Sequence, residues 1–169
     1  MKKTQLLTGI LLPVLCFCMF SCKKDNSTSQ LNVKMTDAPA DYGSVNVDVR
    51  EVWVNMKNDS SGWVELNTNA KIYDLLSLQN GVDTLVANGT VETGTVKEIR
   101  FVLGSNNSIT VAGITYPLVI PSGEESGLKI KIDKKINATV ESLVIDFDAA
   151  LSVRFETGTY KLRPVLRVK

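Results

Sequence analysis

Two pairs of aspartates have a spacing that suits the binding of a cation. Asp146 and Asp148 lie two residues apart, so in a strand both carboxylates point to one face, about 7 Å from each other. Asp37 and Asp41 lie in the short segment "TDAPAD". Together the four side chains supply the oxygen ligands that Ca²⁺ prefers, and they predict a calcium or other cation site. The ordinary alternative is a strand face that is solvated or salt-bridged.

Aromatic side chains suggest a different kind of ligand. A carbohydrate-binding module needs rings that are exposed in a line or a cleft. Trp53, Trp63 and Tyr116 are the candidate ligand-binding residues, and Tyr73 is a further ring of the same type. Core packing of at least one tryptophan is the alternative, because aromatic residues of a small domain are mostly core. The carboxylate spacing also overlaps that of glycosidases, which need a similar aromatic cleft.

A basic stripe follows from alternation in the last predicted strand. Its members are Lys161, Arg163, Arg167 and Lys169. Such a stripe can meet anionic polysaccharide or lipopolysaccharide phosphates. Charge on a terminal strand also discourages edge-to-edge aggregation, and Pro164 favours an edge position. If this strand neighbours the strand of Asp146 and Asp148, its cations should pair with those carboxylates.

The complete absence of histidine limits the reactions available to the chain. It excludes Ser-His-Asp and Cys-His nucleophilic systems and every zinc site that uses histidine. We therefore expect a protein that is not an enzyme and that needs no cofactor, apart from calcium or another cation at the aspartates.

The first residues have the plan of a secretory signal peptide. Lys2 and Lys3 precede the uncharged apolar stretch from Leu6 to Phe20, as a basic region precedes an apolar one in such peptides. The stretch is shorter than the roughly 20 residues that cross a bilayer. We expect residues 1–21 to be removed.

The expected cleavage point resembles a bacterial lipobox. Residues 19–22 read Met-Phe-Ser-Cys, with a small residue directly before the cysteine that becomes the lipidated N-terminus. This predicts lipidation of Cys22. Cys16 and Cys18 would be discarded with the signal peptide, so no cysteine remains for a disulfide or a metal site.

The residues after Cys22 predict a flexible tether and the membrane to which the protein is sorted. Residues 22–30 are polar and lack aromatic side chains, which is typical of a flexible linker. Lipoprotein sorting retains proteins in the inner membrane when aspartate follows the lipidated cysteine, and here that residue is Lys23. We therefore expect anchoring in the outer membrane, and the pattern does not decide on which of its two faces.

Removal of residues 1–21 takes away two lysines and no acid, which changes the formal net charge from +1 to −1. This charge gives no reason to expect nucleic acid as a partner.

Alternation with a period of two dominates residues 31–169. Valines at odd positions of 45–49 give way to apolar residues at even positions of 52–56, which predicts either a β-bulge around Arg50 and Glu51 or a change of sheet there. Turns are expected at residues 58–62 and 112–113, and one helical turn within residues 73–80. About nine strands predict a single all-β domain, an antiparallel β-sandwich of immunoglobulin-like or transthyretin-like type.

Five segments, in order, carry a resemblance to a known family. They are "TDAPADYGSVNVDV", "IYDLLSLQNG", "PSGEESGLKI", "DFDAALSV" and "YKLRPVLRV". The chain from about residue 31 to its end resembles the domain of unknown function 4382 family of bacterial secreted and lipid-anchored proteins. The resemblance implies a β-sandwich on the cell envelope and assigns no catalytic residue.

Two functions fit these observations. The leading hypothesis is an outer-membrane-anchored lipoprotein that acts as a non-enzymatic interaction or structural module of the cell envelope. The alternative is a ligand-capture protein that binds a glycan or a cation such as calcium. The expected partners are the membrane, through the lipid, and a glycan or an envelope protein.

Overall fold

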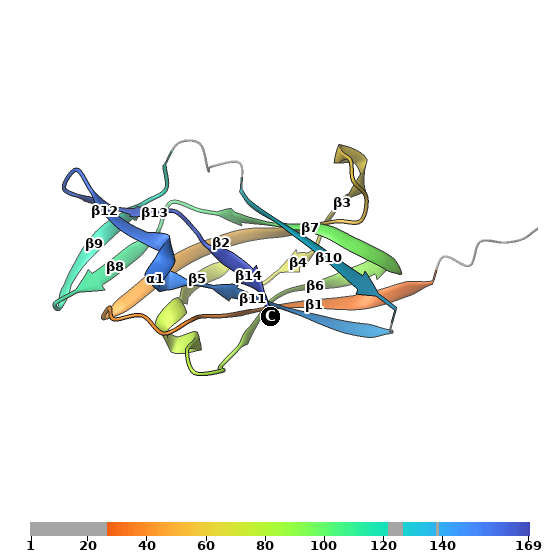
Figure 1. Ribbon diagram of the computed structural model, residues 1–169, viewed down its shortest axis with the longest axis horizontal. Helices are drawn as coiled ribbons and strands as arrows, with labels where there is room; N and C mark the ends of the chain where they lie inside the picture. Colours follow the sequence, from red (N-terminus) through yellow and green to blue (C-terminus); the bar gives the residue numbers. More distant parts are fainter. Residues whose placement is uncertain (1–26, 122–126, 138) are drawn as a thin grey trace, which may run out of the picture.

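The computed structural model describes residues 27–121, 127–137 and 139–169, and these residues form a β-rich fold (Figure 1). The strands are β1 (Thr28–Thr36), β2 (Ser44–Asn55), β3 (Trp63–Glu65), β4 (Asn67–Thr68), β5 (Lys71–Asp74), β6 (Thr84–Glu92), β7 (Gly94–Leu103), β8 (Ser108–Val111), β9 (Ile114–Val119), β10 (Leu128–Ile136), β11 (Val140–Phe147), β12 (Val153–Glu156), β13 (Thr159–Leu162) and β14 (Leu166–Val168). The short helices are the 3₁₀ turns η1 (Ser60–Gly62) and η2 (Leu75–Leu78) and the single α-helical turn α1 (Ala149–Ser152).

The strands form two sheets that do not close into a barrel. The smaller has the order β14-β11-β1-β6-β4, and the larger has the order β10-β7-β2-β8-β9-β13-β12, with β3 and β5 also paired to β2. The predicted all-β, sandwich-like class is confirmed. Both sheets are mixed, however, because β1 runs parallel to β11 and β9 runs parallel to β13.

The core lies on the inner faces of the sheets, where every second residue of the longer strands is buried. In β1 these are Leu31, Val33 and Met35, and Phe101 and Phe147 are among the largest fully buried side chains. The alternation that predicted the strands is therefore the pattern that fills the core.

Strand β2 contains the predicted bulge. Its pairing with β7 shifts register between Val49 and Glu51, and the buried positions pass from Val45, Val47 and Val49 to Val52 and Val54. The extra residue keeps apolar side chains on the core face along the whole strand.

The last predicted strand is two strands in two different sheets. β13 belongs to the larger sheet and β14 to the smaller one, and Pro164 lies in the break between them. Proline has no N–H to donate to a ladder, so the chain crosses from one sheet to the other there. The predicted tether also ends earlier than expected, because β1 begins at Thr28 and Ser29 is buried.

Two hairpins project at one end of the fold. Figure 1 shows the tips of the β8–β9 and β12–β13 hairpins at the left, opposite the end where β1 begins. The β8–β9 turn, Ala112-Gly113, is the predicted one, and both residues have positive φ, 49° and 80°. That geometry suits a tight two-residue turn.

Candidate functional site

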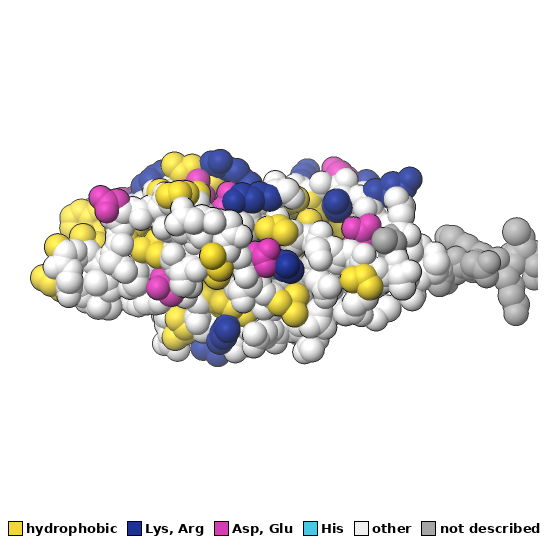
Figure 2. All heavy atoms as spheres, turned by 90° about the horizontal axis from the view of Figure 1, so that it is seen from below, with side chains coloured by type: hydrophobic (Ala, Val, Ile, Leu, Met, Phe, Trp, Pro, Cys, Tyr) yellow, Lys and Arg dark blue, Asp and Glu magenta, His cyan; other side chains and the backbone are white. Residues whose placement is uncertain are grey.

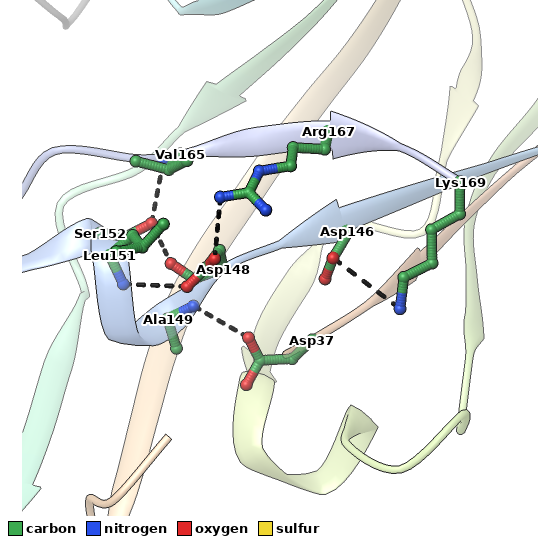
Figure 3. Close-up of polar contacts among 9 residues, drawn as sticks. All are labelled: Asp37, Asp146, Asp148, Ala149, Leu151, Ser152, Val165, Arg167 and Lys169. Carbon is green, nitrogen blue, oxygen red and sulfur yellow. Dashed lines mark hydrogen bonds and ion pairs between the residues drawn. The ribbon is translucent and has the colours of Figure 1, made fainter. Parts of the chain in front are cut away.

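Asp37 is a buried carboxylate at the end of β1. The backbone N–H of Ala149 donates to its Oδ1 at 2.9 Å, and the side chain of Gln79 donates to its Oδ2 at 3.4 Å. The preceding residue, Thr36, donates its hydroxyl to the carbonyls of Leu78 and Val82. These bonds hold the "TDAPAD" segment against η2 on one side and α1 on the other (Figure 3).

Asp146 and Asp148 approach the same place from β11. Asp146 is paired with Thr36 of β1 in the parallel register. Asp148 caps α1, because its Oδ1 accepts the N–H of Leu151 at 2.9 Å. The predicted approach of the "TDAPAD" segment to the Asp146–Asp148 strand is therefore present in the structure.

Cations of β14 and of the residue that follows it pair with two of the three carboxylates. β14 pairs antiparallel with β11, which brings Arg167 Nη2 within 3.4 Å of Asp148 Oδ2 and Lys169 Nζ within 3.8 Å of Asp146 Oδ2 (Figure 3). The expected pairing of the last strand with these aspartates is thus observed. Of the rest of the predicted basic stripe, Lys161 lies in β13 and Arg163 follows that strand, and both pair with Glu156 of β12.

The environment of Asp37 disfavours its charged form. Burial raises the pKa of the Asp37 carboxyl to about 6. The hydrogen bonds from Ala149 and Gln79 oppose this rise, and the charges of Asp146 and Asp148 add to it. At neutral pH the ionised Asp37 carboxylate therefore lowers the stability of the folded chain.

Asp41, the fourth predicted cation ligand, is exposed, and none of the contacts that join the other three includes it. Within the described residues, no group of three or more acidic, histidine or cysteine side chains is arranged to hold a metal ion. One carboxylate oxygen of the cluster is nonetheless unsatisfied: Asp146 Oδ1 is among the buried side-chain atoms that have no hydrogen-bond partner in the described part of the chain. Calcium binding stays a prediction.

The two tryptophans lie on the outer face of the larger sheet and are only half-buried, so neither joins the core as the alternative interpretation expected. The guanidinium of Arg100 stacks over the ring of Trp63 at 4.2 Å. The indole N–H of Trp53 donates to Glu51 at 2.8 Å. Tyr73 is buried and donates its hydroxyl to a backbone carbonyl. Both tryptophans thus have side-chain partners already, and Tyr73 has no free face for a sugar.

Tyr116 belongs to an exposed row of aromatic rings that crosses three strands. Its ring centroid lies 5.2 Å from that of Tyr160, and the ring of Tyr160 lies 4.8 Å from that of Phe155. Tyr116, Tyr160 and Phe155 come from β9, β13 and β12, which are neighbours in the larger sheet. We call these three residues the aromatic row.

The aromatic row lies on the same face of the larger sheet as the core, but beyond the buried part of that face. Each ring lies two residues from a buried side chain of its own strand and so on the same face. These buried side chains are Leu118, Leu162 and Val153. Phe155 is 64% exposed and Tyr116 is 37% exposed, and Figure 2 shows hydrophobic side chains at this end of the molecule, on the left. Tyr160, between the other two rings, is half-buried and packs against the core.

Sequence reasoning found Tyr116 and missed Phe155 and Tyr160. Local alternation placed Tyr160 in a strand, but no pattern indicates that β13 lies parallel to β9. That pairing joins Tyr160 to Leu118, far apart in the sequence, and it is what brings the rings together. The signal that could have found Phe155 is the two-residue turn Thr157-Gly158, which pairs it with Tyr160.

The predicted signal peptide, the lipidation of Cys22 and the first part of the tether lie outside the described residues. In the described ranges, no helix has the length and apolar character needed to cross a membrane.

Comparison with known proteins gives a match to a family model. It covers residues 28–164, a range that begins with β1 and ends at the break before β14. Neither curated proteins nor solved structures yielded a similar chain. The chain belongs to the family described as Domain of unknown function (DUF4382).

Proposed function

We propose that this chain is a lipid-anchored protein of the bacterial outer membrane, and that its domain is a non-enzymatic interaction module of the cell envelope. The observation that carries the proposal is the aromatic row, three rings on adjacent strands, of which Tyr116 and Phe155 are exposed and Tyr160 is half-buried between them. Contiguous exposed apolar surface marks a binding site more often than it marks ordinary surface.

The position of the row suits such a role. β1 begins at one end of the fold, and the hairpins that carry the row lie at the other (Figure 1). A lipid attached before β1 would leave the row directed away from the membrane. The N-terminal plan, with its basic residues, apolar stretch and lipobox-like cysteine, supports the anchor.

The rigidity of the row favours binding over catalysis. The rings stand on paired strands rather than on loops, so little conformational entropy is lost when a ligand stacks on them. The chain has no histidine, and Glu156, the one acid of β12, is paired with Lys161 at 3.1 Å and with Arg163 at 3.2 Å. The arrangement supplies stacking surface, and the acid beside it is already paired.

A glycan is the first ligand to test, because sugar rings stack on exposed aromatic faces. The full chain should bind one or more members of a panel of soluble neutral and anionic polysaccharides. Tyr116→Ala and Phe155→Ala should each weaken that binding about tenfold, or ~1.4 kcal/mol. Trp53→Ala is the matched control, since its ring lies on the other face of the sheet and should not matter. Equal losses for all three variants would contradict the assignment to the row.

Cation capture is a second candidate, and it rests on the unsatisfied Oδ1 of Asp146. Calcium that bound only the folded chain at 100 times its dissociation constant would stabilise it by about 2.7 kcal/mol. Under this candidate, calcium raises the melting temperature of the wild type and not that of Asp146→Asn. An unchanged melting temperature for the wild type removes the candidate.

A further inference from the structure

The two edges of the larger sheet differ in the charges they carry. One edge is β10 and the other is β12. The exposed side chains of β10 include four cations: Lys129, Lys131, Lys134 and Lys135. A row of like charges discourages an edge strand from pairing with a second copy of itself. β12 has no such row, and its two charged residues, Arg154 and Glu156, have opposite signs.

The turn that ends β12 determines which backbone groups face its open edge. Thr157 and Gly158 have φ of 50° and 78°, so β12 and β13 are joined by a two-residue turn of type I′. In such a hairpin the residues that flank the turn, Glu156 and Thr159, exchange both backbone hydrogen bonds. Hydrogen-bonded pairs alternate along a ladder, so the N–H and the C=O of Phe155 point away from β13. They face the open edge of the sheet.

The side chains of β12 are self-complementary about Phe155. Arg154 and Glu156 lie on one face, and Phe155 lies between them on the other. Within the hairpin, Arg154 stands directly opposite Lys161, a like-charge pair that costs stability. The acid on this face of β12, Glu156, pairs with Lys161 and Arg163, and no ion pair of the described residues includes Arg154.

We propose that two copies of this chain pair edge to edge through β12, antiparallel about a twofold axis at Phe155. In this register Phe155 lies opposite the partner subunit's Phe155, and the two residues exchange N–H···O=C bonds with the groups that face the open edge. Arg154 then lies opposite the partner subunit's Glu156, and Glu156 opposite the partner subunit's Arg154. A register centred one residue away would place neither charge opposite its complement.

This pairing has a consequence for the aromatic row. Each row ends at Phe155, so the twofold axis joins two rows into one continuous band of six rings on a single sheet face. The pairing uses the strand edge and leaves the ring faces open. It is therefore independent of what the row binds, and it can fail without contradicting the proposed function.

The interface is small. A strand of four residues buries much less than the roughly 1,200 Å² of stable complexes, so the dimer is weak and reversible. Sedimentation equilibrium of the full chain in detergent, over a wide concentration range, measures it. Wild-type protein should show a concentration-dependent dimer.

Charge swaps test the register. Arg154→Glu and Glu156→Arg should each raise the dimer dissociation constant at least tenfold, because each places like charges opposite one another in both halves of the interface. An equimolar mixture of the two variants should associate as tightly as the wild type, since both contacts are then complementary. Lys135→Glu, on the opposite edge of the sheet, is the control and should leave association unchanged.

Glu156→Arg also loses the ion pairs with Lys161 and Arg163 and could fail to fold for that reason. A second pair of variants therefore tests the dimer without changing these charges. Phe155→Pro removes the outward N–H without removing a bond to β13 and should abolish the dimer. Phe155→Val retains that N–H and should still dimerise. A wild-type chain that stays monomeric at all concentrations, or a mixture of charge variants that associates no better than each variant alone, would overturn the proposal.

Discussion

The backbone N–H of Ala149 donates a 2.9 Å hydrogen bond to Oδ1 of Asp37, a residue 112 positions earlier in the chain. The bond joins the end of β1 to the start of α1, in a place where the carboxylate is almost wholly withdrawn from water. One well-formed hydrogen bond offsets only part of the cost of burying a charge. Asp37 therefore makes the stability of the fold depend on pH.

The first prediction concerns Asp37→Asn. The folded pKa of about 6 lies above the ordinary value of 3.8, so the folded state binds the proton more tightly than the unfolded state does. The ionised group lowers the free energy of unfolding above pH 6, and this penalty fades as the pH falls from 6 to 4. Asn imitates the protonated group. The variant should be more stable than the wild type at pH 8, on the order of 2–3 kcal/mol, and about equal to it near pH 4.

Urea unfolding at several pH values measures this difference. Asp41→Asn is the matched control, because Asp41 lies in the same segment but is exposed. Its stability relative to the wild type should not change with pH. A difference between Asp37→Asn and the wild type that stays constant from pH 4 to pH 8 would show that burial of Asp37 does not control the profile.

The second prediction separates the two roles of Asp148. Asp148→Ala removes both the cap of Leu151 and the ion pair with Arg167, and should lower the free energy of unfolding by about 1–3 kcal/mol. Asp148→Asn retains an oxygen for the cap and loses only the ion pair. Because Arg167 is 57% exposed, that loss should be below about 1 kcal/mol. If Asp148→Ala and Asp148→Asn lowered the urea midpoint equally, the whole effect would come from the ion pair with Arg167 and none from the cap.

The third prediction concerns Gly104, which follows β7. A Cβ at this position would clash with Oδ2 of Asp48 and lie 2.7 Å from Nε of Arg50. Asp48 is buried and its Oδ2 is held by Arg50 at 2.7 Å, so it has little room to move. Gly104→Ala should cost about 2–3 kcal/mol by thermal unfolding. Ser105→Ala, at the exposed neighbour, should change stability by less than about 0.5 kcal/mol.

The fourth prediction concerns the anchor. Cys22→Ala should abolish lipidation and leave a larger precursor that is unprocessed or mislocalised. Detergent phase partitioning and intact-mass spectrometry of the protein from its membrane fraction measure the outcome. Acyl chains on the variant, together with partitioning into the detergent phase, would show that the lipobox interpretation is mistaken.

Much of the fold could be predicted because its information is local. The bulge near Arg50, the turn at Ala112-Gly113 and the helical turn at Leu75–Leu78 each follow from alternation or turn chemistry within a few residues. The parallel pairing of β1 with β11 could not be predicted in this way. It depends on which distant strands share a sheet, and alternation says only that each strand has one buried face.

The candidate sites, too, could be predicted where they depend on local sequence and not where they depend on which distant strands pair. The approach of Asp37 to Asp146 was expected, because isolated acids between apolar residues must be solvated, paired or bound to metal. The split of the final strand at Pro164 was not expected, since both halves keep the same alternation. It decides that Arg167 meets Asp148 while Arg163 meets Glu156 in the other sheet.

The parallel pairing of β1 with β11 also sets an order of events during synthesis. Gln30 has Val140 as its register partner, and β14, the neighbour of β11, comes later still in the sequence. The smaller sheet therefore cannot be completed before the chain from β1 to β14 has been made, and contacts so distant in sequence form slowly. A chain that is exported through a narrow channel must stay unfolded until it has crossed. If this chain is exported as proposed, the topology of its domain would itself supply that delay.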